Sequence, residues 1–425
     1  MNVDVLIVGT GIAGLFTALN IRSDLSVLLI TKGKARDCNS YLAQGGISTV
    51  LNNSDINLFI KDTLKAGNNK NNIISLKEVA KKSRDRLHDL INLGINFDKN
   101  LEKLDYTREG GHSVSRIAHV KDQTGKAIVE GLLKEVSLRA NIKLLEYNSL
   151  NNIIIKNNKC IGALVKNSDG EYKVFSKSVV LATGGIGGVF NSTTNVETLT
   201  GDGIKIALNN NVKVIDMEYQ QLHPTVLYKE KDSTRRLLIT ESLRGEGAFI
   251  VNERLERFVN SLLPRDIVSN AILIELSKSN KPYVYLDARH LGEGYLKSRF
   301  PYIYDECLKE GLRIEKDLIP IAPAHHFSMG GIEIALDGQT SLINLYAIGE
   351  TSCTGVHGSN RLASNSLLEA LVFAKNVAES INVKGIEIKN DNKESDYIIN
   401  KIEENILVDY LKKRVDIKYD KLFNC

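Results

Sequence analysis

Apolar runs alternate with glycine-rich turns along the N-terminal part of the chain. Residues 3–8 and 27–30 are dominated by Val, Leu and Ile, the pattern of strands buried on both faces of a parallel sheet. A glycine turn and a helical pattern that extends to about Arg22 lie between them. The chain therefore opens with a predicted strand–helix–strand unit.

Two later segments have the same buried-strand pattern. Residues 179–183 run into a cluster of glycines, and residues 345–348 run into Gly349 and Glu350. An apolar helix is predicted around residues 367–378. These segments predict an α/β fold with a Rossmann-like, mostly parallel sheet.

The prolines divide the chain. All six lie between Pro224 and Pro323, and the glycine motifs lie mostly on either side. We therefore predict a first domain over residues 1–219, an inserted domain over 220–327, and a return to the first domain over 328–382. Residues 383–425 carry many charges around a sparse apolar pattern, which predicts a short, solvated helical tail.

Composition excludes several classes of protein. The 55 basic and 51 acidic residues give a net charge of +4 with no basic cluster, so no nucleic-acid partner is expected. No apolar stretch is long enough to span a bilayer, and the N-terminus lacks the pattern of a signal peptide. The cysteines are odd in number and never paired as CxxC, which disfavours disulfides and a metal site. A cytoplasmic protein without a membrane partner is expected.

The first strand leads directly into a GxGxxG motif formed by Gly9, Gly11 and Gly14. In this context the glycines allow a tight turn, close approach of a pyrophosphate, and packing of the helix on the sheet. The second strand ends at Thr31-Lys32, so the ribose-binding acid expected about 20 residues on is absent. The motif predicts a dinucleotide site but argues against a simple NAD dehydrogenase.

Two further features indicate FAD as the cofactor. The segment LATGG at 181–185 would lie beside the first strand, and Glu350 follows a strand at the carboxyl edge of the sheet, where ligands of open α/β sheets bind. A carboxylate there can accept hydrogen bonds from ribityl hydroxyls. Taken alone, Glu350 would more often be a helix-capping or solvent-exposed residue, but together with the first two motifs it is expected to bind the cofactor.

Nine motifs then occur in order: NSYLAQGG (39–46), REGGH (108–112), DQTG (122–125), TGDG (200–203), QLHPT (221–225), LITESLRGEGA (238–248), LLPRD (262–266), APAHHFSMGG (322–331) and HGSNRLASNSLLEAL (357–371). Over residues 1–380 the chain resembles the succinate dehydrogenase/fumarate reductase flavoprotein superfamily, and most closely its L-aspartate oxidase family. That resemblance implies an FAD-binding domain interrupted by an α+β capping domain. Members of the family usually end in a larger helical domain than the 40 or so residues found here.

The resemblance implies oxidation of L-aspartate to iminoaspartate, with dioxygen or fumarate as acceptor. This reaction is the first step from aspartate to NAD, and functional coupling to quinolinate synthase is a further expectation. Two alternatives are a soluble fumarate reductase or succinate dehydrogenase flavoprotein, which would need an iron–sulfur or haem partner, and a non-catalytic FAD-binding protein.

The resemblance also assigns catalytic roles. Arg265 matches the proton donor and acceptor, although an arginine is a poor acid because its pKa exceeds ~12. Glu241 and Arg244 match a proton relay, or form an ordinary intrahelical salt bridge. Glu109 matches a carboxylate that pairs with the substrate α-ammonium group, because an unpaired buried carboxylate costs several kcal/mol. Out of context it would be an exposed loop residue.

The remaining site residues follow from the same matches. A planar guanidinium fork suits a dicarboxylate. His325 receives no role. The predicted substrate-binding residues are Gln221, His223, Thr240, His326 and Arg361. The predicted FAD-binding residues are Gly9, Thr10, Gly11, Ile12, Ala13, Gly14, Lys32, Asn39, Ser40, Tyr41, Leu42, Ala43, Gln44, Gly45, Gly46, Asp202, Glu350, Ser366 and Leu367.

Asn39 predicts that FAD is bound without a covalent link. Membrane-bound members of the superfamily attach FAD through a histidine five residues before the glutamine of AQGG, and this chain has Asn39 there. Denaturing the purified protein with acid should release all of the flavin into the supernatant. Flavin fluorescence that stays with the polypeptide on a denaturing gel would contradict the prediction.

Overall fold

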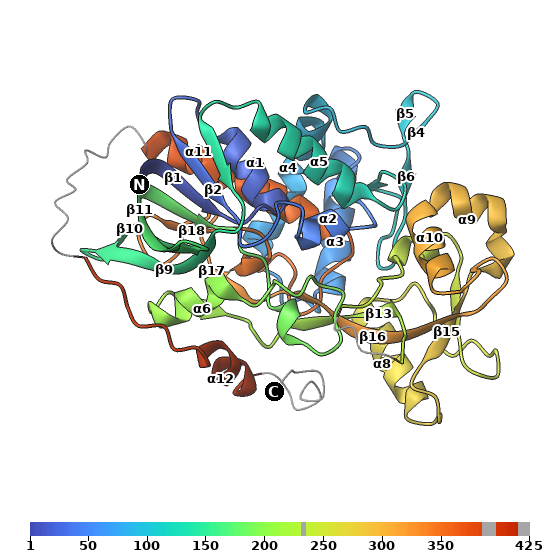
Figure 1. The fold of residues 1–425 in the computed structure, drawn as a ribbon. Helices are drawn as coiled ribbons and strands as arrows, with labels where there is room; N and C mark the ends of the chain where they lie inside the picture. The colour runs from blue at the N-terminus through green and yellow to red at the C-terminus, as the bar shows by residue number, and fades with distance from the viewer. Residues whose placement is uncertain (231–234, 385–396, 415–425) are drawn as a thin grey trace.

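The computed structural model describes residues 1–230, 235–384 and 397–414. Its largest sheet has the strand order β8-β2-β1-β11-β10-β9, and β18 pairs with the end of β11 (Figure 1). The parallel strands are β1 (Asn2–Val8), β2 (Val27–Ile30), β8 (Ile142–Leu145), β11 (Gly170–Leu181) and β18 (Leu345–Ala347). The predicted strand–helix–strand unit and the two later strands are therefore confirmed.

The two faces of this sheet bury different helices. Leu29 and neighbouring side chains of one face pack in a core beneath α1 (Ile12–Asn20), α4 (Ile73–Asn92), α5 (Thr124–Ser137) and α11 (Asn365–Lys384). Leu28 of the other face packs with the hairpin β9 (Ser149–Lys156) and β10 (Lys159–Asn167), and with α6 (Asp202–Asn209). Both faces are covered, which is why the strands read as continuous apolar runs.

A second, antiparallel sheet lies beside the first, with the order β13-β16-β15-β14. Its core is separate from the two cores of the parallel sheet. The strands are β13 (Gln220–Leu227), β14 (Phe249–Val251), β15 (Val284–Asp287) and β16 (Ile319–Ser328), and the helices are α7 (Glu241–Gly245), α8 (Arg265–Leu276), α9 (Glu293–Arg299) and α10 (Pro301–Lys309). This separate core supports our proposal of a capping domain over residues 220–327.

Short elements connect these layers. Helix α3 (Ile56–Ala66) packs on α4, and helix α2 (Asn39–Leu42) packs on α5. The small strands are β3 (Ile47–Ser48), β4 (Lys99–Asn100), β5 (Lys103–Leu104), β6 (Tyr106–Thr107), β7 (Ile117–Ala118), β12 (Val214–Ile215), β17 (Gly331–Glu333) and β19 (Ser352–Cys353). Within the described ranges, no helix combines the length and the hydropathy needed to cross a membrane.

Asp122 of the DQTG motif joins the two layers. Its carboxylate is buried and accepts the backbone N–H groups of Tyr302, at 3.3 Å, and Ile303, at 2.9 Å, at the start of α10. A carboxylate is favourable there because the first N–H groups of a helix lack intrahelical partners. This contact holds a helix of the second layer against the first.

The C-terminal segment differs in part from the prediction. Residues 385–396 and 415–425 lie outside the described residues. Helix α12 (Ile406–Lys412) is present, but Leu407 and Leu411 are only 2% and 1% exposed and pack against the core beside α6. The expectation of a solvated helix is wrong for this segment, because two leucines four residues apart suffice to form an apolar face.

Candidate active site

A cavity between the two layers collects residues from most of the sequence motifs. The glycine turn, the segment 39–46, Lys32, Asp202, Glu350, Ser366 and Leu367 line it, as do Glu109, His223, Thr240, Glu241, Arg265, His326 and Arg361. Four predicted site residues lie outside this lining. They are Gly14, Tyr41, Gln221 and Arg244.

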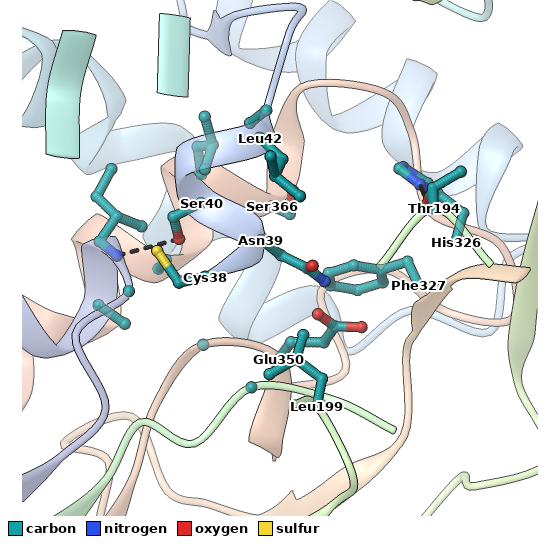
Figure 2. A pocket seen from close by; sticks show the side chains of 18 of the residues that line it. Cys38, Asn39, Ser40, Leu42, Thr194, Leu199, His326, Phe327, Glu350 and Ser366 are labelled. Atoms are coloured by element: carbon teal, nitrogen blue, oxygen red, sulfur yellow. Dashed lines mark hydrogen bonds between the residues drawn. The ribbon is translucent and has the colours of Figure 1, made fainter. Parts of the chain in front are cut away.

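The glycine turn has the geometry of a pyrophosphate cradle. Gly9 has φ +113°, and a Cβ there would overlap the carbonyl oxygen of Ala182. Gly11 caps α1, and Ser40 Oγ accepts the backbone N–H of Ile12 at 3.0 Å (Figure 2). Gly14 packs against Gly9 instead of facing the cavity, which is the close-packing role of the third glycine.

The end of β2 carries a cation where NAD enzymes carry an acid. Lys32 Nζ donates to Asp202 Oδ2 at 2.7 Å and to Thr200 Oγ1 at 3.0 Å. Tyr41 points elsewhere, with its hydroxyl 3.2 Å from Glu130 Oε1. Lys32 and Asp202 therefore form a polar pair at the cavity wall, and Tyr41 does not contribute its side chain.

Glu350 lies inside the cavity and is neither a helix cap nor a solvent residue. Its Oε1 accepts the Ser328 N–H at 3.1 Å, and its side chain points into the same space as Asn39, beside Phe327 (Figure 2). A Cβ at Gly185 would overlap its carboxylate. Burial raises the pKa of Glu350 to about 7, against the Ser328 hydrogen bond and the charge of Arg361.

The polar atoms along this cavity fit a dinucleotide with a ribityl chain. The cradle at Gly11 has no side chain, and Gln44 Oε1 is buried without a hydrogen-bond partner among the described residues. Unsatisfied buried acceptors are rare, and each one suggests a missing ligand or water. Asn39 is satisfied, with its Oδ1 accepting the Val196 N–H at 3.0 Å. The polar groups along the cavity therefore fit FAD.

Arg265, the first residue of α8, lies at the other end of the cavity. Its Nε donates to Glu241 Oε2 at 2.6 Å and its Nη1 to Gln221 Oε1 at 2.9 Å. Nη2 has no partner among the described residues. Arg244 lies behind Glu241 at 3.5 Å, on the same turn of α7, as predicted. Burial raises the pKa of Glu241, but the charges of Arg265 and Arg244 hold it below its ordinary value.

Glu109 is 2% exposed and is held by two hydroxyl groups. Ser242 Oγ donates to its Oε1 at 2.8 Å and Ser364 Oγ to its Oε2 at 2.5 Å. In the described part of the chain, neither oxygen lies within ion-pair distance of a cation. Burial, followed by the charge of Glu241, raises the pKa of Glu109. The out-of-context alternative of an exposed loop residue therefore does not hold for Glu109.

The two predicted histidines meet across the cavity, with ring centroids 5.0 Å apart. Burial, then the charge of Arg265, holds the pKa of both His223 and His326 well below the ordinary value. The Thr225 N–H donates to Nδ1 of His223 at 3.3 Å, so the neutral ring must carry its proton on Nε2. His223 is therefore a neutral donor. It lies where the pairing of β13 with β16 shifts register, between His223 and Val226, in the stretch that contains Pro224.

Arg361 is positioned by an aromatic ring and a hydroxyl. Its guanidinium carbon lies 4.4 Å from the centroid of Phe327, and Nη1 donates to Ser366 Oγ at 3.0 Å. Its buried Nε has no partner among the described residues. Burial, then the charge of Arg265, lowers the pKa of Arg361 to about 9. A buried guanidinium with open donors is suited to bind a carboxylate.

Sequence reasoning missed the residues that support these groups. Thr194 Oγ1 lies 2.7 Å from His326 Nδ1, and Phe327 covers Arg361. Ser242 lies in the motif at 238–248 and Ser364 in the motif at 357–371, but nothing in their spacing indicates contact with Glu109. His325 is buried, stacked on Phe190 and 2.9 Å from Gln220 Oε1, so it has a structural role.

Comparisons with known proteins agree with this geometry. The model of an FAD binding domain matches residues 4–367. An L-aspartate oxidase of Clostridium perfringens is 46% identical over 99% of this chain and 97% of its own length. This chain belongs to the L-aspartate oxidase family. It is an FAD-dependent oxidoreductase of the succinate dehydrogenase/fumarate reductase flavoprotein superfamily.

Some other members of the L-aspartate oxidase family are longer. The Bacillus subtilis relative is 40% identical over 89% of this chain but only 71% of its own length. Among solved structures, Escherichia coli quinol fumarate reductase has a TM-score of 0.87 and 29% identity over 92% of this chain and 72% of that chain. The α/β fold with an FAD-binding domain is thereby confirmed.

Glu350 should make the stability of the FAD-free protein depend on pH. Below its ordinary pKa of 4.5 the carboxyl is neutral in both states, and as the pH rises to about 7 only the unfolded state ionises fully, so stability falls. Glu350→Gln should therefore stabilise the FAD-free protein by about 2–4 kcal/mol at pH 8 and by much less at pH 5. Urea unfolding at both pH values measures this.

The matched control is Glu102→Gln, which removes an exposed carboxyl that does not line the cavity. An equal gain for Glu350→Gln at the two pH values would show that the carboxyl of Glu350 is not the titrating group.

Proposed function

We propose that this chain oxidises L-aspartate to iminoaspartate, with dioxygen or fumarate as the final acceptor. One observation carries the proposal. Glu109 is a buried carboxylate with no cation at ion-pair distance among the described residues. It shares a cavity with the guanidinium groups of Arg265 and Arg361, which have donors without a partner among the same residues. One site for a cation beside two sites for anions complements an amino dicarboxylate.

The α-ammonium group of L-aspartate is the partner that Glu109 lacks. A buried, unpaired carboxylate is costly, and an ammonium group in the cavity removes that cost. Succinate and fumarate carry no cation. Glu109 therefore favours the proposed reaction over the alternative of a fumarate reductase or succinate dehydrogenase flavoprotein.

The carboxylates are bound by charge and by neutral donors together. Arg361 donates from its unpartnered nitrogens to one carboxylate of L-aspartate. Phe327 and Ser366 fix the orientation of the Arg361 guanidinium. His223 adds a neutral Nε2–H donor. Because the histidines are neutral, they donate to a carboxylate without adding positive charge beside the arginines. Such fixed geometry lowers the entropic cost of reaching the transition state.

Proton transfer is assigned to Arg265 and the residues behind it. When bound, FAD would supply the acceptor for the hydride lost from C2 of L-aspartate. The nitrogen must also lose a proton. Arg265 lines the cavity, and its guanidinium can accept that proton only as its own Nε proton passes to Glu241, whose Oε2 is 2.6 Å away. Glu241 and Arg244 extend this path away from the substrate. We propose that they keep the charge change at Arg265 small.

Iminoaspartate is an imine and hydrolyses in water. An enzyme that consumes it promptly is therefore favoured, and functional coupling to quinolinate synthase remains part of the proposal. A cytoplasmic location, where such coupling would occur, is proposed with it.

Glu109→Gln should separate two reactions of the same protein. The amide keeps the shape but removes the charge, so kcat/KM for L-aspartate should fall about 30- to 5,000-fold, the effect of deleting one side of a desolvated charge pair. Fumarate reduction by reduced flavin should stay within a few-fold of the unmodified protein. Both rates are measured on one preparation, with iminoaspartate trapped as it forms.

Failure of the unmodified protein to form iminoaspartate would contradict the proposed function. Parallel losses in the two reactions of the variant would instead show that Glu109 supports the fold or the flavin.

Arg265→Lys tests proton transfer while keeping a positive charge beside Glu241. The lysine lacks the fork that contacts Glu241 and Gln221 together, so turnover should fall by about 10²–10⁴-fold, the usual contribution of a positioned acid or base. FAD content, measured by absorbance after denaturation, should be unchanged. Turnover within a few-fold of the unmodified protein would restrict Arg265 to binding the ligand.

A further inference from the structure

The two serines that hold Glu109 come from different parts of the fold. Ser242 lies on α7, beside the second sheet, and Ser364 lies immediately before α11, which packs on the first. Each donates a hydroxyl to a different oxygen of Glu109, at 2.8 Å and 2.5 Å. The carboxylate is thus fixed from two sides, and its orientation depends on both layers.

Ser364 is held in a backbone conformation that few side-chain-bearing residues adopt. Its φ is +61°, in the left-handed region, which costs of order 1 kcal/mol for a residue other than glycine. Its carbonyl oxygen accepts the N–H of Ser48 at 3.1 Å and the Ser48 hydroxyl at 3.2 Å. This conformation brings Ser364 Oγ to Glu109.

The flavin-binding motif leaves the space that this arrangement needs. A Cβ at Gly45 would overlap Oε1 of Glu109 and lie 3.4 Å from Ser364 Oγ. The absence of a side chain at Gly45 therefore lets the carboxylate approach the AQGG segment.

The two hydroxyl donors, Ser242 and Ser364, are neutral, so they leave the negative charge of Glu109 available to a ligand. A lysine or arginine in place of either serine would pair with Glu109 and leave no charge for a ligand. Hydroxyl groups stabilise the anion without neutralising it, and both lower the pKa of Glu109 against burial and the charge of Glu241. The cations facing Glu109 are Arg265 on α8, Arg244 on α7, and Arg361.

We propose that Ser242 and Ser364 are positioning residues that give the site its preference for amino dicarboxylates, by fixing both oxygens of Glu109 with neutral donors. The inference rests on the proposed function and deepens it. Neither serine is assigned a contact with the reacting atoms, and both act through Glu109.

The test uses the FAD-loaded variants Ser242→Ala and Ser364→Gly, since glycine accepts the backbone conformation of residue 364. Each should lower kcat/KM for L-aspartate about tenfold to a hundredfold, the effect of losing a hydrogen bond to a charged group. Fumarate reduction by reduced flavin should stay within twofold. The acid limb of the L-aspartate pH profile should also move to higher pH, because a carboxylate with fewer donors holds its proton more tightly.

Ser269→Ala is the matched control. Ser269 is a buried serine on α8 whose hydroxyl has no partner among the described residues, so its loss should change neither rate. Equal losses of both reactions in the Glu109-linked variants, or an unchanged L-aspartate rate and pH profile, would overturn the proposal.

A separate binding measurement distinguishes this proposal from the proposed function. L-aspartate and succinate are titrated without oxygen into each protein with its flavin already reduced, so that neither ligand is oxidised, and perturbation of the flavin absorbance is followed. The serine variants should lose affinity for L-aspartate and keep it for succinate. This result would stand even if the unmodified protein bound L-aspartate without oxidising it, whereas equal affinities in all proteins would refute the role of the serines.

Discussion

The burial of unbalanced charge is the constraint on which the site depends. Glu109, Glu241, Arg265 and Arg361 are each less than a tenth exposed, yet only Glu241 and Arg265 form a direct pair. Charges removed from water are costly unless partners compensate for them. The remaining acid and the remaining guanidinium are therefore a complementary surface for a zwitterionic ligand, and the same burial moves their pKa values.

Glycines make this burial sterically possible. Each of three buried carboxylates lies against a glycine whose Cβ would overlap it: Glu109 against Gly45, Glu241 against Gly110, and Glu350 against Gly185. None of these three glycines has a left-handed φ, so what they have in common is the room they leave. The glycine-rich motifs of the sequence thus provide space for carboxylates as well as for a pyrophosphate.

The charges come from both layers, so the relative placement of the layers decides whether the site exists. Arg265 and Glu241 belong to helices beside the antiparallel sheet. Glu109 and Arg361 belong to loops of the first layer, and Glu350 to its short 3-10 helix Gly349–Thr351. Asp122 binds the start of α10 across the boundary, and Ser242 does the same for Glu109. Polar contacts of this kind are directional, so they fix orientation as well as proximity.

The sequence by itself determined the strand–helix–strand unit, the glycine cradle and the residue types of the site, because short-range patterns encode strands, turns and tight approaches. It also indicated Glu350, through its place beside a strand end, and Arg265, through the resemblance of its motif to the family. Only the tertiary structure decided that Ser242 and Ser364 hold Glu109, that Phe327 covers Arg361, and that Leu407 and Leu411 bury the last helix. Those contacts join residues that lie 34 to 255 positions apart in the sequence, or depend on which face of a helix is covered, and no local pattern records either.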